Sequence, residues 1–180
     1  MYPFIRMFKE LAINRNAPPL ALTGTHVSHH MCWPWDIDLW MELNNGRSLT
    51  LYDLGRIPLA GRVGLIKALR RNKWGLTMAG VSVRWRQRVR TFETIEMHSR
   101  CVGWDDRFIY LEQSMWKKDG TCASQAIYRS AVTGKSGMVP THEVMAKMGV
   151  IAPSPELPAT VRAWIAADAE RVWPPERVAA

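Results

Sequence analysis

The fold of this chain is decided by the stretch from Trp33 to Arg47, which reads WPWDIDLWMELNNGR. It joins a segment of strand-like composition to one of helical periodicity, and it carries three acids and two adjacent asparagines. Asn44 or Asn45 is well suited to cap the start of the helix. The first turn of a helix offers backbone N–H groups without intrahelical partners and a partial positive charge. A carboxylate next to such amides fits acyl transfer, although the same residue types are also ordinary caps and turns.

The segment after this stretch is expected to form a helix that is apolar on most sides. Leu51, Tyr52 and Leu54 lie on different faces, so other elements must cover the helix. Pro58 is expected to end or kink it. Further helices are expected near residues 1–15, 63–71, 141–148 and 159–171.

Five stretches have the composition of strands, namely residues 23–33, 76–90, 94–104, 108–117 and 121–133. In the third, Ile95, Met97, Ser99 and Cys101 alternate with polar residues, as in a half-buried strand. Short turns join the later stretches, which favours an antiparallel meander. We therefore predict an α+β chain in which a curved antiparallel sheet wraps around one central helix, with short C-terminal helices. Residues 1–19 are interpreted as an amphipathic segment and linker, 20–149 as the main domain and 150–180 as a helical extension.

The composition narrows the classes of function. Lys and Arg outnumber Asp and Glu by 24 to 16, and the net charge of +8 suits a polyanion such as nucleic acid, anionic lipid or a phosphorylated cofactor. No nucleic-acid-binding signature accompanies the charge, so we expect no nucleic-acid partner. The N-terminal amphipathic segment is compatible with weak membrane-surface contact at most. The three cysteines and five histidines are scattered, so we expect no metal site, a reducing compartment and a cytoplasmic location.

The quoted stretch resembles the Asp-x-Asp-x-x-x-His-x-Asn-Asn signature of hotdog-fold thioesterases, the superfamily of 4-hydroxybenzoyl-CoA thioesterase. Within that superfamily the chain is most similar to the THEM6-like acyl-CoA thioesterase proteins. The resemblance continues through residues 49–56 (LTLYDLGR) and returns at 103–113 (GWDDRFIYLEQ), and it covers about residues 23–149. It implies a hotdog fold, hydrolysis of acyl-CoA thioesters without a cofactor other than the coenzyme A of the substrate, and assembly as a homodimer or a dimer of dimers.

The resemblance also assigns roles to individual residues. The second acid of the signature falls on Asp38, which is implied to be the nucleophile or general base. The backbone N–H near Asn45 is implied to polarise the thioester carbonyl, and Glu42 is an alternative base. Trp40 and Glu42 replace the Asn and His that some relatives carry, which leaves open a protein that only binds acyl-CoA or lipid.

Substrate-binding residues are predicted around the same stretch. Asp36 and Asn44 are expected to orient the loop and the helix start, with Trp40 beside them. Arg84, Arg86, Arg88 and Arg90 alternate, so one continuous strand would place all four on one face, where they suit coenzyme A phosphates. The alternatives are a solvated face or a subunit contact. The substrate-contact residues predicted here are Asp36, Trp40, Asn44, Arg84 and Arg86.

Overall fold

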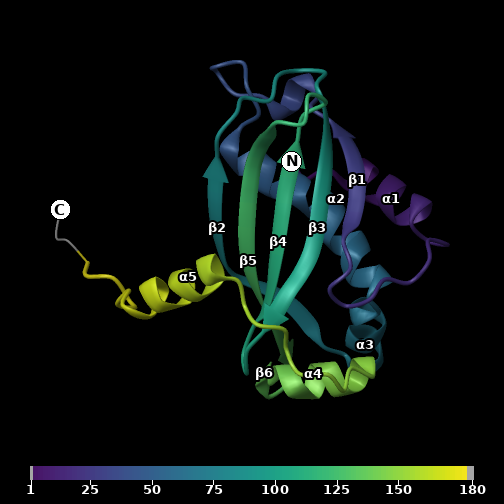
Figure 1. The fold of residues 1–180 in the computed structure, drawn as a ribbon, viewed down its shortest axis with the longest axis vertical. Coiled ribbons are helices and arrows are strands. Elements are labelled where there is room, and N and C mark those ends of the chain that lie inside the picture. The colour runs from purple at the N-terminus through teal and green to yellow at the C-terminus, as the bar shows by residue number, and fades with distance from the viewer. Residues whose placement is uncertain (1, 178–180) are drawn as a thin grey trace.

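The computed structural model describes residues 2–177 and has one six-stranded antiparallel sheet around a long helix (Figure 1). The helices are α1 (Phe4–Ile13), the 3₁₀ turn η1 (Pro34–Asp36), α2 (Asn45–Arg62), α3 (Leu65–Asn72), α4 (Thr141–Met148) and α5 (Ala159–Ala169). The strands are β1 (His26–Met31), β2 (Gly75–Trp85), β3 (Thr94–Trp104), β4 (Ile109–Trp116), β5 (Cys122–Gly134) and β6 (Gly137–Val139). None of the helices within residues 2–177 has the length and apolarity needed to cross a bilayer.

The strands pair in the order β1-β3-β4-β5-β2, with β6 attached to β5. All pairings are antiparallel, which agrees with the short turns between the later strands. β1 and β2 therefore form the two ends of the sheet. Residues 94–104 alternate as expected, with Ile95, Met97 and Ser99 buried.

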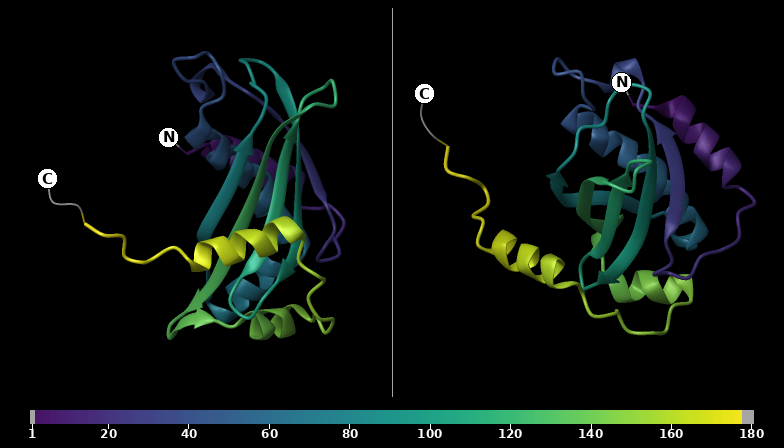
Figure 2. Two further views of the ribbon diagram at one scale, coloured as in Figure 1. Left: turned by 60° about the vertical axis from the view of Figure 1, so that its left-hand side comes forward. Right: turned by 45° about the horizontal axis from the view of Figure 1, so that its top comes forward.

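The concave face of the sheet packs on α2, whereas α5 lies against the outer face (Figure 2). Gly55 allows the close approach of α2 to the sheet, because a Cβ at this position would meet the side chains of Ser99 and Met97. Gln113 joins the two layers by donating Nε2 hydrogen bonds to the Tyr52 carbonyl at 2.9 Å and to Ser99 Oγ at 2.7 Å. The core of the curved sheet is thus built around the middle of α2.

The predicted α+β hotdog architecture is confirmed. Of the two alternatives expected at Pro58, an end of the helix is wrong, because α2 continues through this residue to Arg62. Proline costs the helix one hydrogen bond, but Pro58 is buried, and packing of the surrounding helix on the sheet outweighs that local preference. The second predicted strand ends at Trp85, because the N–H groups of Arg86 and Gln87 both bond to the Ala123 carbonyl and the ladder stops.

Candidate active site

The loop before α2 is organised by Asp36, whose side chain is fully buried. Its Oδ2 atom accepts hydrogen bonds from Arg6 Nη2 at 2.6 Å and from the Trp33 N–H at 3.0 Å. Its Oδ1 atom accepts one from Arg47 Nε at 2.7 Å. Both oxygens are occupied inside the protein, so Asp36 ties α1, the loop and the first turn of α2 together and does not present itself as a substrate contact.

Asp38 lies in a tight turn of the same loop. Its Oδ1 atom accepts a hydrogen bond from the Trp40 N–H at 2.9 Å, and its own N–H donates to the Glu42 carbonyl at 2.9 Å. Met41 closes the turn with a φ of 58°, in the left-handed region. The side chain of Trp40 is 73% exposed. Asp38 therefore braces the turn, and neither it nor Trp40 lines the pocket at the start of α2.

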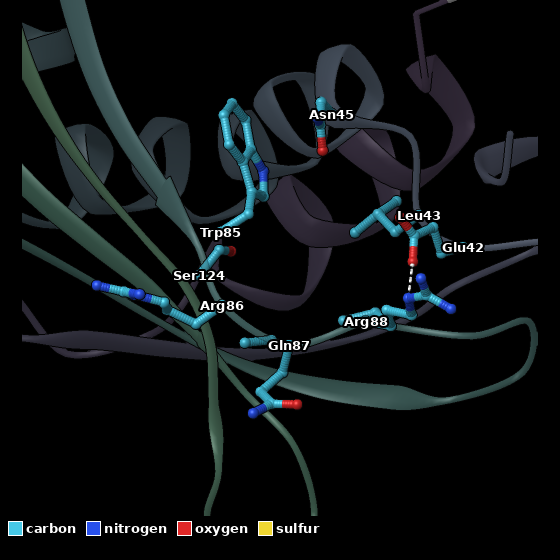
Figure 3. A pocket seen from close by; sticks show the side chains of 10 residues that line it. Glu42, Leu43, Asn45, Trp85, Arg86, Gln87, Arg88 and Ser124 are labelled. Atoms are coloured by element: carbon cyan, nitrogen blue, oxygen red, sulfur yellow. Dashed lines mark ion pairs between the residues drawn. The ribbon is translucent and has the colours of Figure 1, made fainter. Parts of the chain in front are cut away.

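Asn44 caps α2, as predicted, with its Oδ1 atom accepting the Arg47 N–H at 3.0 Å. Beside this helix start lies a pocket of about 200 Å³ (Figure 3). Its lining comprises Glu42, Leu43, Asn45, Trp85, Arg86, Gln87, Arg88, Val89, Ala123 and Ser124. The pocket brings together two of the three predicted catalytic residues, Glu42 and Asn45, and leaves Asp38 outside.

Glu42 faces a cation across the pocket. Its Oε2 atom lies 2.8 Å from Arg88 Nε, and Figure 3 shows Arg88 reaching toward Glu42 while Arg86 extends away from it. The Glu42 side chain is 30% exposed and that of Arg88 69%, but the Oε2 atom of Glu42 is itself buried, so the carboxylate is only partly open to solvent.

The pocket wall is held by a hydrogen-bonded chain that sequence reasoning missed. Trp85 Nε1 donates to Ser48 Oγ at 3.0 Å, and Ser48 Oγ donates to the Asn45 carbonyl at 2.6 Å. Ser124 Oγ lies 2.8 Å from the Tyr52 hydroxyl. Burial raises the pKa of that hydroxyl, because the anionic form would lose its solvation. Ser124 carries no local signal in the sequence, because pairing of the distant strand β5 with β2 brings it to this place.

The prediction that four alternating arginines share one strand face is wrong, because β2 ends at Trp85. Arg84 lies at the end of the strand, exposed and outside the pocket, whereas Arg86 and Arg88 line it from the irregular segment that follows. Within residues 2–177 no group of three or more His, Cys, Asp or Glu side chains is arranged to hold a metal ion.

Comparisons with known proteins agree with this architecture. The chain belongs to the thioesterase-like superfamily, whose family model matches residues 32–165. The match extends past Gly149 into α5. Protein THEM6 of Xenopus laevis is 33% identical over 133 residues, which cover 73% of this chain and 63% of that protein, so the chain spans just under two thirds of its relative.

Two solved structures share the fold. The probable thioesterase YbaW of Escherichia coli aligns with a TM-score of 0.65 at 12% identity, over 70% of this chain and 98% of YbaW. The protein smu.793 of Streptococcus mutans, solved bound to acetyl CoA, aligns with a TM-score of 0.52 at 14% identity, over 64% of this chain and 86% of that one. At these sequence identities the structural similarity shows that the chain has a hotdog fold, but it does not assign roles to individual residues.

Proposed function

We propose that this protein hydrolyses acyl-CoA thioesters in the pocket at the start of α2. The observation that carries the proposal is that Glu42 and the first residue of α2, Asn45, line one pocket. Membership of the thioesterase-like superfamily supports the reaction class, and the acetyl CoA bound to the structurally similar smu.793 supports the choice of acyl carrier. The chemistry needs only a carboxylate and oriented amides.

In the proposed reaction Glu42 removes a proton from a water molecule that attacks the thioester carbonyl carbon. The carbonyl oxygen becomes an oxyanion, which N–H groups at the first turn of α2 stabilise. The tetrahedral intermediate then expels the coenzyme A sulfur, and the proton held by Glu42 returns to it. The products are the free acid and the thiol, and the carboxylate is regenerated.

Arg86 and Arg88 suit the phosphates of coenzyme A. Their guanidinium groups bind phosphate oxygens in a bidentate manner, and both residues lie on the rim of the pocket. Arg88 also has a second contact, since it faces Glu42. We propose that it positions the carboxylate and leaves Arg86 as the main phosphate contact.

The proposal is tested by thiol release from acetyl-, decanoyl- and benzoyl-CoA, comparing the unmodified protein with Glu42→Gln and Asp38→Asn. Glu42→Gln is expected to lower kcat at least ~100-fold, as for a general base, with Asp38→Asn within threefold. The reverse order would transfer the role to Asp38, as the family resemblance implies. Glu143→Gln, on the exposed side of α4, is the matched control and should not change the rate.

A second candidate function is acyl-CoA binding without turnover. It is favoured by the ion pair between Glu42 and Arg88, which engages the proposed base. Calorimetric binding of decanoyl-CoA without thiol release at any pH would support this function and exclude the hydrolase. Turnover of the substrate within seconds would exclude the binding-only function.

We also propose that two copies associate through β2. This strand lies at one end of the sheet and exposes Leu76, Val81 and Trp85 to 38%, 40% and 42%. An exposed apolar edge strand is a surface that pairs readily with a second strand. Sedimentation should show a dimer, and Val81→Lys should yield monomers, whereas Val27→Lys on β1, 44% exposed at the other end of the sheet, should leave the dimer intact.

A further inference from the structure

A second hollow lies between the C-terminal half of α2, the helices α3 and α4, and the inner face of the sheet. Its volume is about 370 Å³, and its walls are mostly aliphatic. They include Leu59, Leu65, Leu69, Ile109, Leu111 and Met145. Five of these six side chains belong to the buried core, whereas Arg70 and Leu76 in the same lining are exposed, so the hollow reaches from the core to the surface.

An apolar space of this size departs from the close packing of protein interiors. Such a space offers few partners to water and favours an apolar ligand, and its volume lies within the range of small-molecule sites. If one methylene group takes about the space of a liquid water molecule, ~30 Å³, the hollow accommodates roughly 12 carbon atoms.

The charged residues among those that line the hollow are both cations, Arg56 and Arg70. Arg56 pairs with Asp53 and lies over the ring of Tyr128, with its guanidinium carbon 4.4 Å from the ring centre. The Nη1 atom of Arg56 is buried and has no hydrogen-bond acceptor within residues 2–177. Arg70 is exposed on α3 and belongs to the lining, as does the exposed Leu76 at the start of β2. An aliphatic hollow with a buried spare donor and an exposed cation matches a ligand with an alkyl chain and an anionic end.

The hollow is separate from the pocket at the start of α2, and the two share no lining residue. From Asn45 to Ile57 the helix rises roughly 18 Å at 1.5 Å per residue. Between these positions Leu51, Tyr52 and Leu54 are fully buried against the sheet.

We propose that this hollow is a second ligand site, which binds a saturated fatty acyl chain of about 10–14 carbons with its anionic end at Arg56 and Arg70. The chain belongs either to a free fatty acid or to an acyl-CoA. This site does not depend on the hydrolytic reaction proposed above.

The test is calorimetric titration of the full chain with dodecanoate, hexanoate, dodecyltrimethylammonium and S-dodecyl-CoA, a thioether that cannot be hydrolysed. Dodecanoate is expected to bind one per chain, at least ~100-fold tighter than hexanoate, since each buried methylene contributes roughly fourfold. Dodecyltrimethylammonium should bind at least tenfold more weakly than dodecanoate. Binding of dodecanoate alone identifies the free acid as the ligand. Binding of S-dodecyl-CoA alone identifies the thioester, but it supports this site only where the variants below weaken it, because S-dodecyl-CoA can also occupy the pocket at the start of α2.

Variants locate the binding. Ala60→Phe places a ring in the hollow from α2 and should weaken binding at least tenfold while preserving the circular dichroism spectrum. Met148→Trp fills the hollow from α4 and provides the same test if Ala60→Phe does not fold. Arg70→Glu should weaken dodecanoate binding at least threefold, whereas Lys67→Glu makes the same charge change on α3 outside the lining and should not.

The site is overturned if neither dodecanoate nor S-dodecyl-CoA saturates, or if the filling variants bind as well as the unmodified protein. It is also overturned if Ala60→Phe changes the oligomeric state without ligand, because a second copy would then fill the hollow. Acetyl-CoA hydrolysis is measured on the same variants. The acetyl group is too short to occupy the hollow. Loss of dodecanoate binding therefore reports on the second site alone, and loss of acetyl-CoA hydrolysis reports on the hydrolase alone.

Discussion

The Oε2 atom of Glu42 lies 2.8 Å from the Nε atom of Arg88, across the pocket that the start of α2 shares with the segment after β2. Because Arg88 is 69% exposed, the pair contributes less than about 1 kcal/mol to stability. Arg88→Gln is therefore expected to leave urea unfolding nearly unchanged and to lower kcat/KM for acyl-CoA about tenfold, mainly through loss of Glu42 orientation, because Arg86 remains as the main phosphate contact. Arg90→Gln, outside the pocket, is the control, and equal losses in the two variants would remove Arg88 from the site.

Asp36 forms a buried ionic cluster with two arginines beside the start of α2. Its buried carboxylate binds Arg6 and Arg47, whose side chains are 17% and 15% exposed. Removing one member of a buried ionic cluster costs about 3–5 kcal/mol, because the remaining charges lose their partner. Asp36→Asn should lower the free energy of unfolding in urea by that amount, and Asp38→Asn by less than about 1 kcal/mol. A similar small loss in both would show that the cluster does not hold the loop.

Two glycines of α2 provide a matched pair. A Cβ on Gly55 would lie 2.8 Å from Met97 Sδ and closer still to Ser99 Oγ, whereas a Cβ on Gly61 would meet nothing within 4 Å. Overpacking costs about 1–3 kcal/mol, so Gly55→Ala should lower the unfolding free energy by that amount. Gly61→Ala should raise it by up to about 1 kcal/mol through helix propensity. Stabilisation by both changes would contradict the close approach of α2 to the sheet.

Two buried histidines on β1 predict acid sensitivity. Burial lowers the pKa of His26 to about 4, and the Arg62 charge acts in the same direction; burial also lowers the pKa of His30 to about 4. Both are more easily protonated in the unfolded chain, with an ordinary pKa near 6.5. Their contribution to stability is therefore complete above pH 6.5 and is lost as the pH falls toward 4, by about 3 kcal/mol for each histidine.

Glu10, 3.8 Å from His30, acts in the opposite direction, since burial raises its pKa. The measurement is urea unfolding at pH 7.5, 6.0 and 4.5 for the unmodified protein and for His30→Gln. The variant should lose less stability over this range. Parallel pH curves would contradict the assignment of the acid sensitivity to His30.

The sequence alone determined the α+β architecture, the start of α2 and the alternation of β3, because these depend on contacts within a few residues. Asn44 caps the helix by accepting a hydrogen bond from the N–H of Arg47, three residues along the chain. Ile95 and Met97 both face the core because alternate residues of a strand point to the same side. The family resemblance added the thioesterase class. Pro58 shows the limit of local preference, since the packed helix around it continues.

Tertiary structure decided which of these residues meet. Ser124 and Arg88 reach the start of α2 only because β5 and the segment after β2 fold back against it, over separations that no local pattern records. The same applies to Asp36, whose two arginines come from α1 and α2. The hollow beneath α2 is a property of packing, since it depends on how completely side chains from seven helices and strands fill the space between them.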